Sequence, residues 1–308
     1  MSQPAQLAAA GVAGVTLAEG IARLARTASI EINVHDAAHM PAARAWLAPG
    51  TRIFVSFLPK QGWEDTLAAA RAVRAAGFEP VPHVPVRRVS DAATLDRNLG
   101  RLVAESQVRE LLLISGDYPQ AQGPYSTVLQ VMQSGLLAKH GIRRLSVAGH
   151  PEGHPAVALD VIRQAELDKA ALGAEQGLDL ALLTQVVFEH GPLLQWAAGL
   201  RAHGVRARLV AGLAGPASIT TLFKFAMRCG AGPSIRALGV RPGSLMKLLG
   251  DRGPEEVVRG LAAARASGAA DLDGIHLFCF GGFLRSAEWL HRVANGQFQL
   301  DDKASFRV

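Results

Sequence analysis

Cysteine and aromatic residues are scarce in this sequence of 308 residues. The two cysteines, Cys229 and Cys279, lie fifty residues apart and form no Cys-x-x-Cys pair, so neither a disulfide framework nor a structural zinc site is indicated. We therefore expect a reducing, cytoplasmic location and no metal. Aromatic residues make up 6% of the chain, and the arginines form no basic block despite a net charge of +6. This pattern argues against nucleic-acid binding and favours anionic small molecules as ligands.

Long hydrophobic runs are absent as well. No apolar stretch approaches the roughly 18 residues that a membrane span requires. The uncharged run from Leu7 to Ala18 has no basic residue before it, so we expect neither a span nor a signal peptide. Hydrophobic residues nevertheless make up 49% of the chain and charged residues 19%, which excludes a disordered protein. The length fits one large α/β barrel or two ordinary domains.

Short apolar runs alternate along the chain with longer segments of helical period, a pattern typical of parallel strands joined by crossover helices. The helical segments are expected at Trp63 to Ala76, Ala92 to Ser106, Ser126 to His140, His154 to Gln176 and Pro192 to His203. Several of them end in a glycine at the C-cap, namely Gly77, Gly141 and Gly204. Eight strands are expected, at Ser29 to Val34, Arg52 to Phe57, Pro80 to Val84, Glu110 to Ile114, Arg144 to Ala148, Leu180 to Phe188, Ala207 to Leu213 and Gly274 to Phe280.

This alternation predicts a single-domain (β/α)8 TIM barrel over residues 1–308, with residues 1–15 as a peripheral N-terminal extension. No linker or internal repeat divides the chain. The alternative is an open doubly wound sheet, which is disfavoured because no Gly-x-Gly-x-x-Gly follows the first strand.

Polar side chains lie within or just after most of these strands. Because the carboxyl ends of barrel strands share one face, we expect these side chains to converge on one mouth. They are Glu31, Ser56, His83, Asp117, His150 with His154, Gln185 and His276.

Glu31 is the most informative of them, since it stands in the middle of an otherwise apolar strand. Burial of an unpaired carboxylate raises its pKa until the group is protonated near neutral pH, and a protonated carboxyl can act as a general acid. The alternative is a structural ion pair with an arginine such as Arg52.

The other strand-end groups leave more than one interpretation. Asp117 follows Gly116, where a ligand could approach the backbone, but it could equally cap a turn. His150 and His154 lie in a Gly/Pro-rich turn that suits a phosphate or ribose better than a metal. Gln185 suits the edge of a pterin or flavin ring, or a hydrogen bond within a barrel layer. His83 taken alone is most simply a core histidine.

Five segments in chain order resemble methylenetetrahydrofolate reductase. They are Ser-x-Glu31, Pro82-His83, Leu-x-x-Gly116-Asp117-x-Pro119, Val147-Ala-Gly-x-Pro-Glu-x-His154-Pro and Thr184-Gln185. The resemblance implies an FAD-dependent barrel that reduces 5,10-methylenetetrahydrofolate to 5-methyltetrahydrofolate with NADH or NADPH. In that family the nicotinamide passes hydride to the flavin and leaves before the folate takes its place.

The resemblance also implies roles for individual residues. Glu31 would be the general acid, Asp117 would support the electrophile, and the folate would also contact Gln185 and Phe278. The cofactor-binding residues would be Ser56, His83, Arg88, Ser115, Gly116, Asp117, Ala148, His150, His154, Glu166 and Lys169.

Three departures from the family pattern affect the cofactor assignment. Leu58, Ser115 and His150 stand where the family usually has Thr, Arg and Tyr. Arg87 or Arg88, just after the third strand, is a candidate to compensate for the lost arginine. These changes leave open a flavin-independent reductase with direct hydride transfer, and a non-catalytic folate-binding barrel is a further alternative. We also expect a homo-oligomer.

Overall fold

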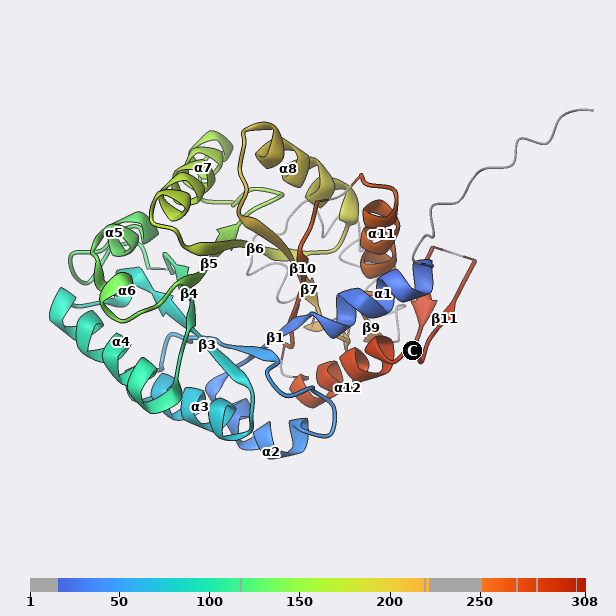
Figure 1. The fold of residues 1–308 in the computed structure, drawn as a ribbon, viewed down its shortest axis with the longest axis horizontal. Helices are drawn as coiled ribbons and strands as arrows, with labels where there is room; N and C mark the ends of the chain where they lie inside the picture. Colours follow the sequence, from blue (N-terminus) through green and yellow to red (C-terminus); the bar gives the residue numbers. More distant parts are fainter. Residues whose placement is uncertain are drawn as a thin grey trace, which may run out of the picture.

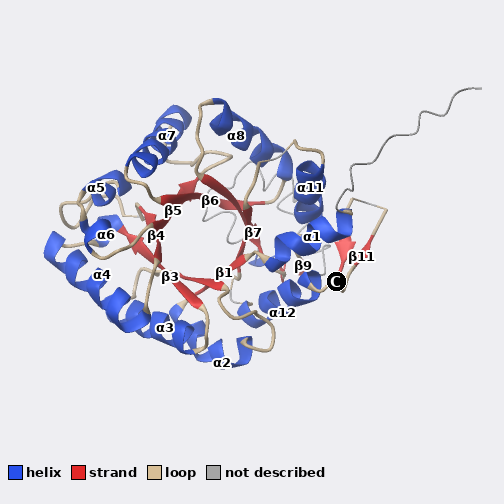
Figure 2. Ribbon diagram, viewed as in Figure 1, coloured by secondary structure: helices blue, strands red, loops and turns tan. Residues whose placement is uncertain are grey.

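The structure is a computed structural model that describes residues 16–116, 118–218, 220–221, 251–269, 271–280, 282–302 and 304–308, with the backbone alone at 251 and 252. Its central feature is a closed barrel of parallel strands in chain order, which excludes an open sheet (Figures 1 and 2). The predicted (β/α)8 barrel is therefore confirmed. The barrel strands are β1 (Ser29–Ile32), β2 (Arg52–Val55), β3 (Glu79–Pro85), β4 (Glu110–Ile114), β5 (Arg144–Gly149), β6 (Asp179–Val187), β7 (Arg208–Ala214) and β10 (Gly274–Phe278).

Helices surround this barrel as an outer ring (Figure 2). They are α1 (Leu17–Arg26), α2 (Met40–Ala43), α3 (Trp63–Ala75), α4 (Ala92–Ser106), α5 (Val128–Gln133), α6 (Leu136–Lys139), α7 (Leu159–Glu175), α8 (His190–Ala202), α11 (Glu255–Ala266) and α12 (Phe283–Ala294). Two 3-10 turns, η1 (Val34–His39) and η2 (Val86–Arg88), follow β1 and β3. Two small antiparallel sheets pair β8 (Ala217–Ser218) with β9 (Asp251–Arg252) and β11 (Gln299–Leu300) with β12 (Phe306–Arg307).

The predicted helix boundaries hold at the carboxyl ends and fail in two places. Gly77, Gly141 and Gly204 all take the positive φ of a helix C-cap motif. The single helix expected over 126–140 is two short helices, because Gly135 with φ 76° interrupts it. The helix expected from His154 begins at Leu159 instead, since His154 pairs with Val157 in an isolated β-bridge.

Alternation along each strand separates two apolar layers. Outward residues such as Ile30, Ile53 and Leu111 pack in the large core cluster shared with the helices. Inward residues such as Phe54 and Leu112 fill the barrel interior.

The amino-terminal end of the barrel holds an ion pair between a partly exposed arginine and a buried glutamate. Arg52 Nη1 lies 3.6 Å from Glu110 Oε1, which also accepts a 2.9 Å hydrogen bond from Ser146 Oγ. Arg52 stands two residues before Phe54, the register partner of Glu31, and so lies nearer the amino-terminal end of β2. The alternative interpretation of Glu31 as the partner of Arg52 is therefore wrong.

Among the described residues, no helix is long and apolar enough to cross a membrane.

Candidate active site at the barrel mouth

A cavity of about 390 Å³ opens among residues at the carboxyl ends of the strands. It contains side chains from opposite sides of the barrel, as expected when parallel strands share one polarity. The structure thus brings together many of the residues predicted from the sequence. Those that line the cavity are Glu31, Ser56, His83, Ala148, His154, Gln185 and Phe278.

Glu31 and His83 form the chemical centre of this cavity. Glu31 Oε2 lies 3.3 Å from His83 Nε2, and that nitrogen has no hydrogen-bond partner among the described residues. Burial raises the pKa of Glu31 to about 8, with the charge of Asp36 as a second cause, whereas burial lowers the pKa of His83 to about 3. Both groups are therefore mainly uncharged at pH 7, and Glu31 carries a proton that it can donate.

Asp36 is a second carboxylate in the lining, which sequence reasoning missed. It belongs to η1, where its Oδ2 accepts a 3.0 Å hydrogen bond from the Asn33 backbone amide. Asn33 Oδ1 in turn accepts from the amides of His35 and Asp36. The Asn-x-x-Asp capping pattern directly after the first strand is the sequence signal that could have revealed it.

Aromatic and apolar side chains form much of the remaining wall. Phe278 and Phe280 stack with ring centroids 6.2 Å apart, and Phe57 and Leu58 lie in the lining with them. Cys279 lies between the two stacked residues in sequence, and burial raises the pKa of its thiol. No lysine or arginine lines the cavity within the described part of the chain.

Gln185 reaches the cavity at an irregularity in β6. The register between β6 and β7 shifts between Leu183 and Val186, and the Gly212 amide donates to Thr184 Oγ1 at 2.8 Å. A Cβ on Gly212 would lie 2.3 Å from the Thr184 carbonyl oxygen, so glycine is required for this close approach.

Glu166 and Lys169 do not line the cavity, contrary to their predicted cofactor contacts. Glu166 is fully buried and accepts from the His150 amide at 2.7 Å, Arg163 Nη1 at 2.7 Å and Trp196 Nε1 at 3.0 Å. Lys169 Nζ donates to the Ala148 carbonyl at 3.0 Å, and burial lowers its pKa. Both side chains of α7 therefore hold the end of β5 from the helix side.

Three other predicted cofactor residues, Arg88, Ser115 and Gly116, lie just after β3 and β4, beside the barrel mouth. Arg88 donates to the Pro59 carbonyl at 2.6 Å, and its guanidinium lies 5.3 Å from the ring centroids of both Phe57 and Tyr118. The Ser115 carbonyl accepts from the Arg87 amide, and Gly116 has φ 84°. Neither Arg88, Ser115 nor Gly116 is among the lining residues.

Two further histidines predicted at strand ends, His150 and His276, do not line the cavity. Burial, followed by the nearby charge of Lys169, lowers the pKa of His150 to about 4, and its ring lies edge-on to that of His154. His276 is fully buried in the barrel, with Nδ1 2.8 Å from Ser29 Oγ, so we assign it a structural role. Asp117, predicted to be catalytic, lies outside the described residues.

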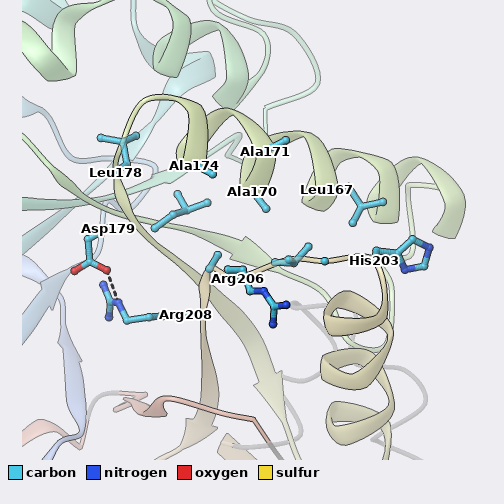
Figure 3. Close-up of a pocket in the computed structure, with 13 residues that line it drawn as sticks. Leu167, Ala170, Ala171, Ala174, Leu178, Asp179, His203, Arg206 and Arg208 are labelled. Atoms are coloured by element: carbon cyan, nitrogen blue, oxygen red, sulfur yellow. Dashed lines mark hydrogen bonds and ion pairs between the residues drawn. The ribbon is translucent and has the colours of Figure 1, made fainter.

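A second cavity, of about 450 Å³, lies near the opposite ends of β6 and β7 (Figure 3). Its wall is formed by alanine and leucine side chains of α7, by the connection from α8 to β7 and by the first residues of β6 and β7. These first residues, Asp179 and Arg208, form an ion pair at 2.7 Å. Amino-terminal strand ends serve stability in barrels, so the mouth cavity is the candidate active site. The described residues contain no group of three His, Cys, Asp or Glu side chains arranged to hold a metal.

No family model matches the chain. Among solved structures, it is similar to dihydropteroate synthase from Thermus thermophilus, with a TM-score of 0.45 and 13% identity over 86% of this chain and 93% of that one. At this level of similarity the match gives no information on the reaction or the ligand.

Proposed function

We propose that this protein reduces 5,10-methylenetetrahydrofolate to 5-methyltetrahydrofolate with a reduced nicotinamide dinucleotide. The observation that supports this most is the position of the Glu31 carboxyl group at the barrel mouth, 3.3 Å from His83, where burial raises its pKa to about 8. Opening the five-membered ring of the folate requires a proton on its N10 amine. A carboxyl that stays protonated up to about pH 8 supplies that proton under neutral conditions.

The proposed reaction balances with Glu31 as the only acid. Its proton moves to N10 as the bond between N10 and the methylene carbon breaks, which leaves an iminium cation at N5. The nicotinamide then transfers a hydride to the methylene carbon, which becomes the methyl group, and leaves oxidised. Glu31 finally regains a proton from solvent.

The remaining lining residues have roles that follow from their chemistry. The stacked rings of Phe278 and Phe280 provide an apolar surface for a flat heterocycle. The Gln185 amide offers one donor and one acceptor group to a ring edge. Apolar walls also keep water from the iminium, which water would otherwise attack.

The described residues do not fit the diphosphate of FAD. No lysine or arginine lines the cavity in the part of the chain that the structure describes, while two carboxyl groups, those of Glu31 and Asp36, do. Arg88 and Lys169, the cations that the resemblance would assign to FAD, already donate hydrogen bonds to backbone carbonyls. We therefore assign no step to a flavin, and FAD stays a prediction of the resemblance.

The decisive experiment incubates the purified full-length chain with 5,10-methylenetetrahydrofolate and NADH or NADPH, with and without added FAD. We expect 5-methyltetrahydrofolate by mass spectrometry, in equal amounts in both arms. Formation only with FAD would restore the flavin mechanism. Folate binding by calorimetry without product or nicotinamide oxidation would instead favour the non-catalytic barrel, and neither binding nor turnover would refute the proposal.

The Glu31→Gln variant tests the assigned acid. The amide keeps the shape of the side chain but cannot donate a carboxyl proton, so we expect about 10²-fold to 10⁴-fold slower folate reduction with folate binding retained. Glu64→Gln, an exposed glutamate on α3, is the matched control and should keep full activity. Unchanged turnover in Glu31→Gln would remove Glu31 from the acid role.

A further inference from the structure

Two carboxyl groups occupy the mouth cavity, and their local settings differ. Glu31 comes from the strand β1, whereas Asp36 comes from the 3-10 turn η1 that follows it. Asp36 is fixed by two reciprocal hydrogen bonds with Asn33. Asp36 Oδ2 accepts from the Asn33 backbone amide, and Asn33 Oδ1 accepts from the Asp36 backbone amide. A carboxylate held by backbone capping in this way keeps its position when a ligand enters.

A second feature of the same cavity indicates a ligand. His83 is more than nine-tenths buried, lines the cavity and has no hydrogen-bond partner for Nε2 among the described residues. Buried polar atoms in native proteins are nearly always satisfied, so this nitrogen is expected to meet a bound molecule or water. Asp36 therefore faces a site with an unsatisfied polar group.

From this arrangement we infer that the Asp36 carboxylate stabilises the positive charge that develops on the substrate when Glu31 gives up its proton. This inference rests on the proposed function, because the charge in question is the iminium cation of the folate. Gln185 lies on β6, which is separated from β1 by β7 and β10. If Gln185 holds the ring edge, the reacting amine lies on the side of Glu31 and Asp36.

The Asp36 charge acts on both states of the reaction. Before transfer, its negative charge opposes ionisation of Glu31 and so keeps the acid protonated. After transfer, the same charge attracts the iminium cation. An ionised group fixed before the reaction needs no reorganisation when charge develops, which is why such groups are effective in catalysis.

The other titratable side chains that line this cavity in the described part of the chain are His83, His154 and Cys279, and none of them supplies a negative charge. A histidine such as His154 is either neutral or positively charged. His83 on β3 is neutral because burial lowers its pKa to about 3. Cys279, after β10, stays a thiol because burial raises its pKa. Asp36 on η1 is therefore the group that contributes a negative charge next to Glu31 in this part of the chain.

The test compares Asp36→Asn with Asp36→Glu and with Asp65→Asn. Asparagine at 36 can still accept from the Asn33 amide, so the capping of η1 is kept while the charge is lost. Asp65 is an exposed matched control, because its Oδ2 caps the start of α3 by accepting from the Gly62 amide at 2.9 Å. It lies outside the cavity lining.

We expect Asp36→Asn to lower kcat by roughly tenfold, with KM for the folate little changed, and to shift the basic limb of the pH profile down by about one pH unit. Asp36→Glu should recover most of the rate, and Asp65→Asn should match the parent protein. An active parent protein whose Asp36→Asn variant keeps both its kcat and its pH profile would overturn the inference while leaving the proposed function intact.

A second measurement is independent of turnover. The infrared carbonyl band of the protonated Glu31 carboxyl, identified by its loss in Glu31→Gln, can be followed against pH in the free protein. We expect its midpoint to fall in Asp36→Asn and to stay in place in Asp65→Asn. An unchanged midpoint in Asp36→Asn would overturn the inference even if the parent protein shows no folate reduction, in which case the proposed function fails separately.

Discussion

Glu31 Oε2 lies 3.3 Å from His83 Nε2, yet the two groups do not form an ion pair at neutral pH. Burial favours the neutral form of each, because it raises the pKa of the carboxyl to about 8 and lowers that of the imidazole to about 3. A charged pair would lose more hydration than the attraction between the partners returns. At neutral pH the Glu31 carboxyl therefore carries a proton that it can donate.

The pH dependence of turnover follows from this protonation state. The active form of Glu31 is the protonated one, which predominates below its pKa of about 8. We expect kcat for folate reduction to fall as pH rises through about 8, measured by stopped-flow nicotinamide absorbance between pH 6 and 10. A flat profile across that range would contradict the assigned acid.

The stability of the protein should also depend on Glu31. Its pKa is higher in the folded chain than the ordinary value of 4.5, so the folded state binds more protons than the unfolded state between these values. The free energy of unfolding therefore falls as pH rises from about 4.5 to about 8 and levels off above that. Urea unfolding at pH 6 and at pH 9 should show that the free energy of unfolding decreases less between these pH values in Glu31→Gln than in the parent protein. Equal decreases would show that Glu31 does not cause the pH dependence of stability.

Glu166 is expected to stabilise the end of β5. Replacement by alanine leaves the His150 amide, Trp196 Nε1 and one Arg163 nitrogen without their buried acceptor. We expect Glu166→Ala to lower the free energy of unfolding by about 3–5 kcal/mol. Gln164→Ala, an exposed position on the same helix, should change it by less than about 0.5 kcal/mol. Denaturant titrations that give the two variants equal stability would contradict this role.

Gly212 is expected to tolerate no side chain. A Cβ there would lie 2.3 Å from the Thr184 carbonyl oxygen and 2.6 Å from the Phe278 ring. Gly212→Ala should therefore lose about 1–3 kcal/mol of stability and weaken folate binding through Gln185. Gly199→Ala on α8, where no atom lies within 4 Å of the added Cβ, should be neutral or stabilising by up to about 1 kcal/mol. Thermal unfolding measures the stability of the two variants, and calorimetry measures their folate binding. Equal stability and equal folate binding in Gly212→Ala and Gly199→Ala would contradict the close packing at the irregularity in β6.

Several site residues could be predicted from the sequence because their signal is local. A carboxyl in an apolar strand, as at Glu31, and an amide in another, as at Gln185, stand out against the period-two pattern. Their meeting in one cavity follows from the shared polarity of parallel strands.

Other positions could not be predicted in this way. The start of α7 depends on the β-bridge between His154 and Val157, and the packing of Trp196 decides what Glu166 contacts. An aspartate three residues after the N-cap of a helix or turn occurs at Asp36 and also at Asp65, at the exposed start of α3. Only the packing of η1 against the barrel mouth places Asp36 in the cavity lining.

The sequence by itself determined the order of the barrel strands and helices and the strand positions that carry polar side chains, and it favoured a closed barrel over an open sheet. These properties follow from hydrophobic periodicity and chain connectivity, which can be read from residues close together in the sequence. Only the tertiary structure decided that Arg52 pairs with Glu110, that Glu166 and Lys169 hold β5, and that Glu31 meets His83. Such contacts depend on burial and on distances across the closed barrel, and these exist only once distant segments have packed together.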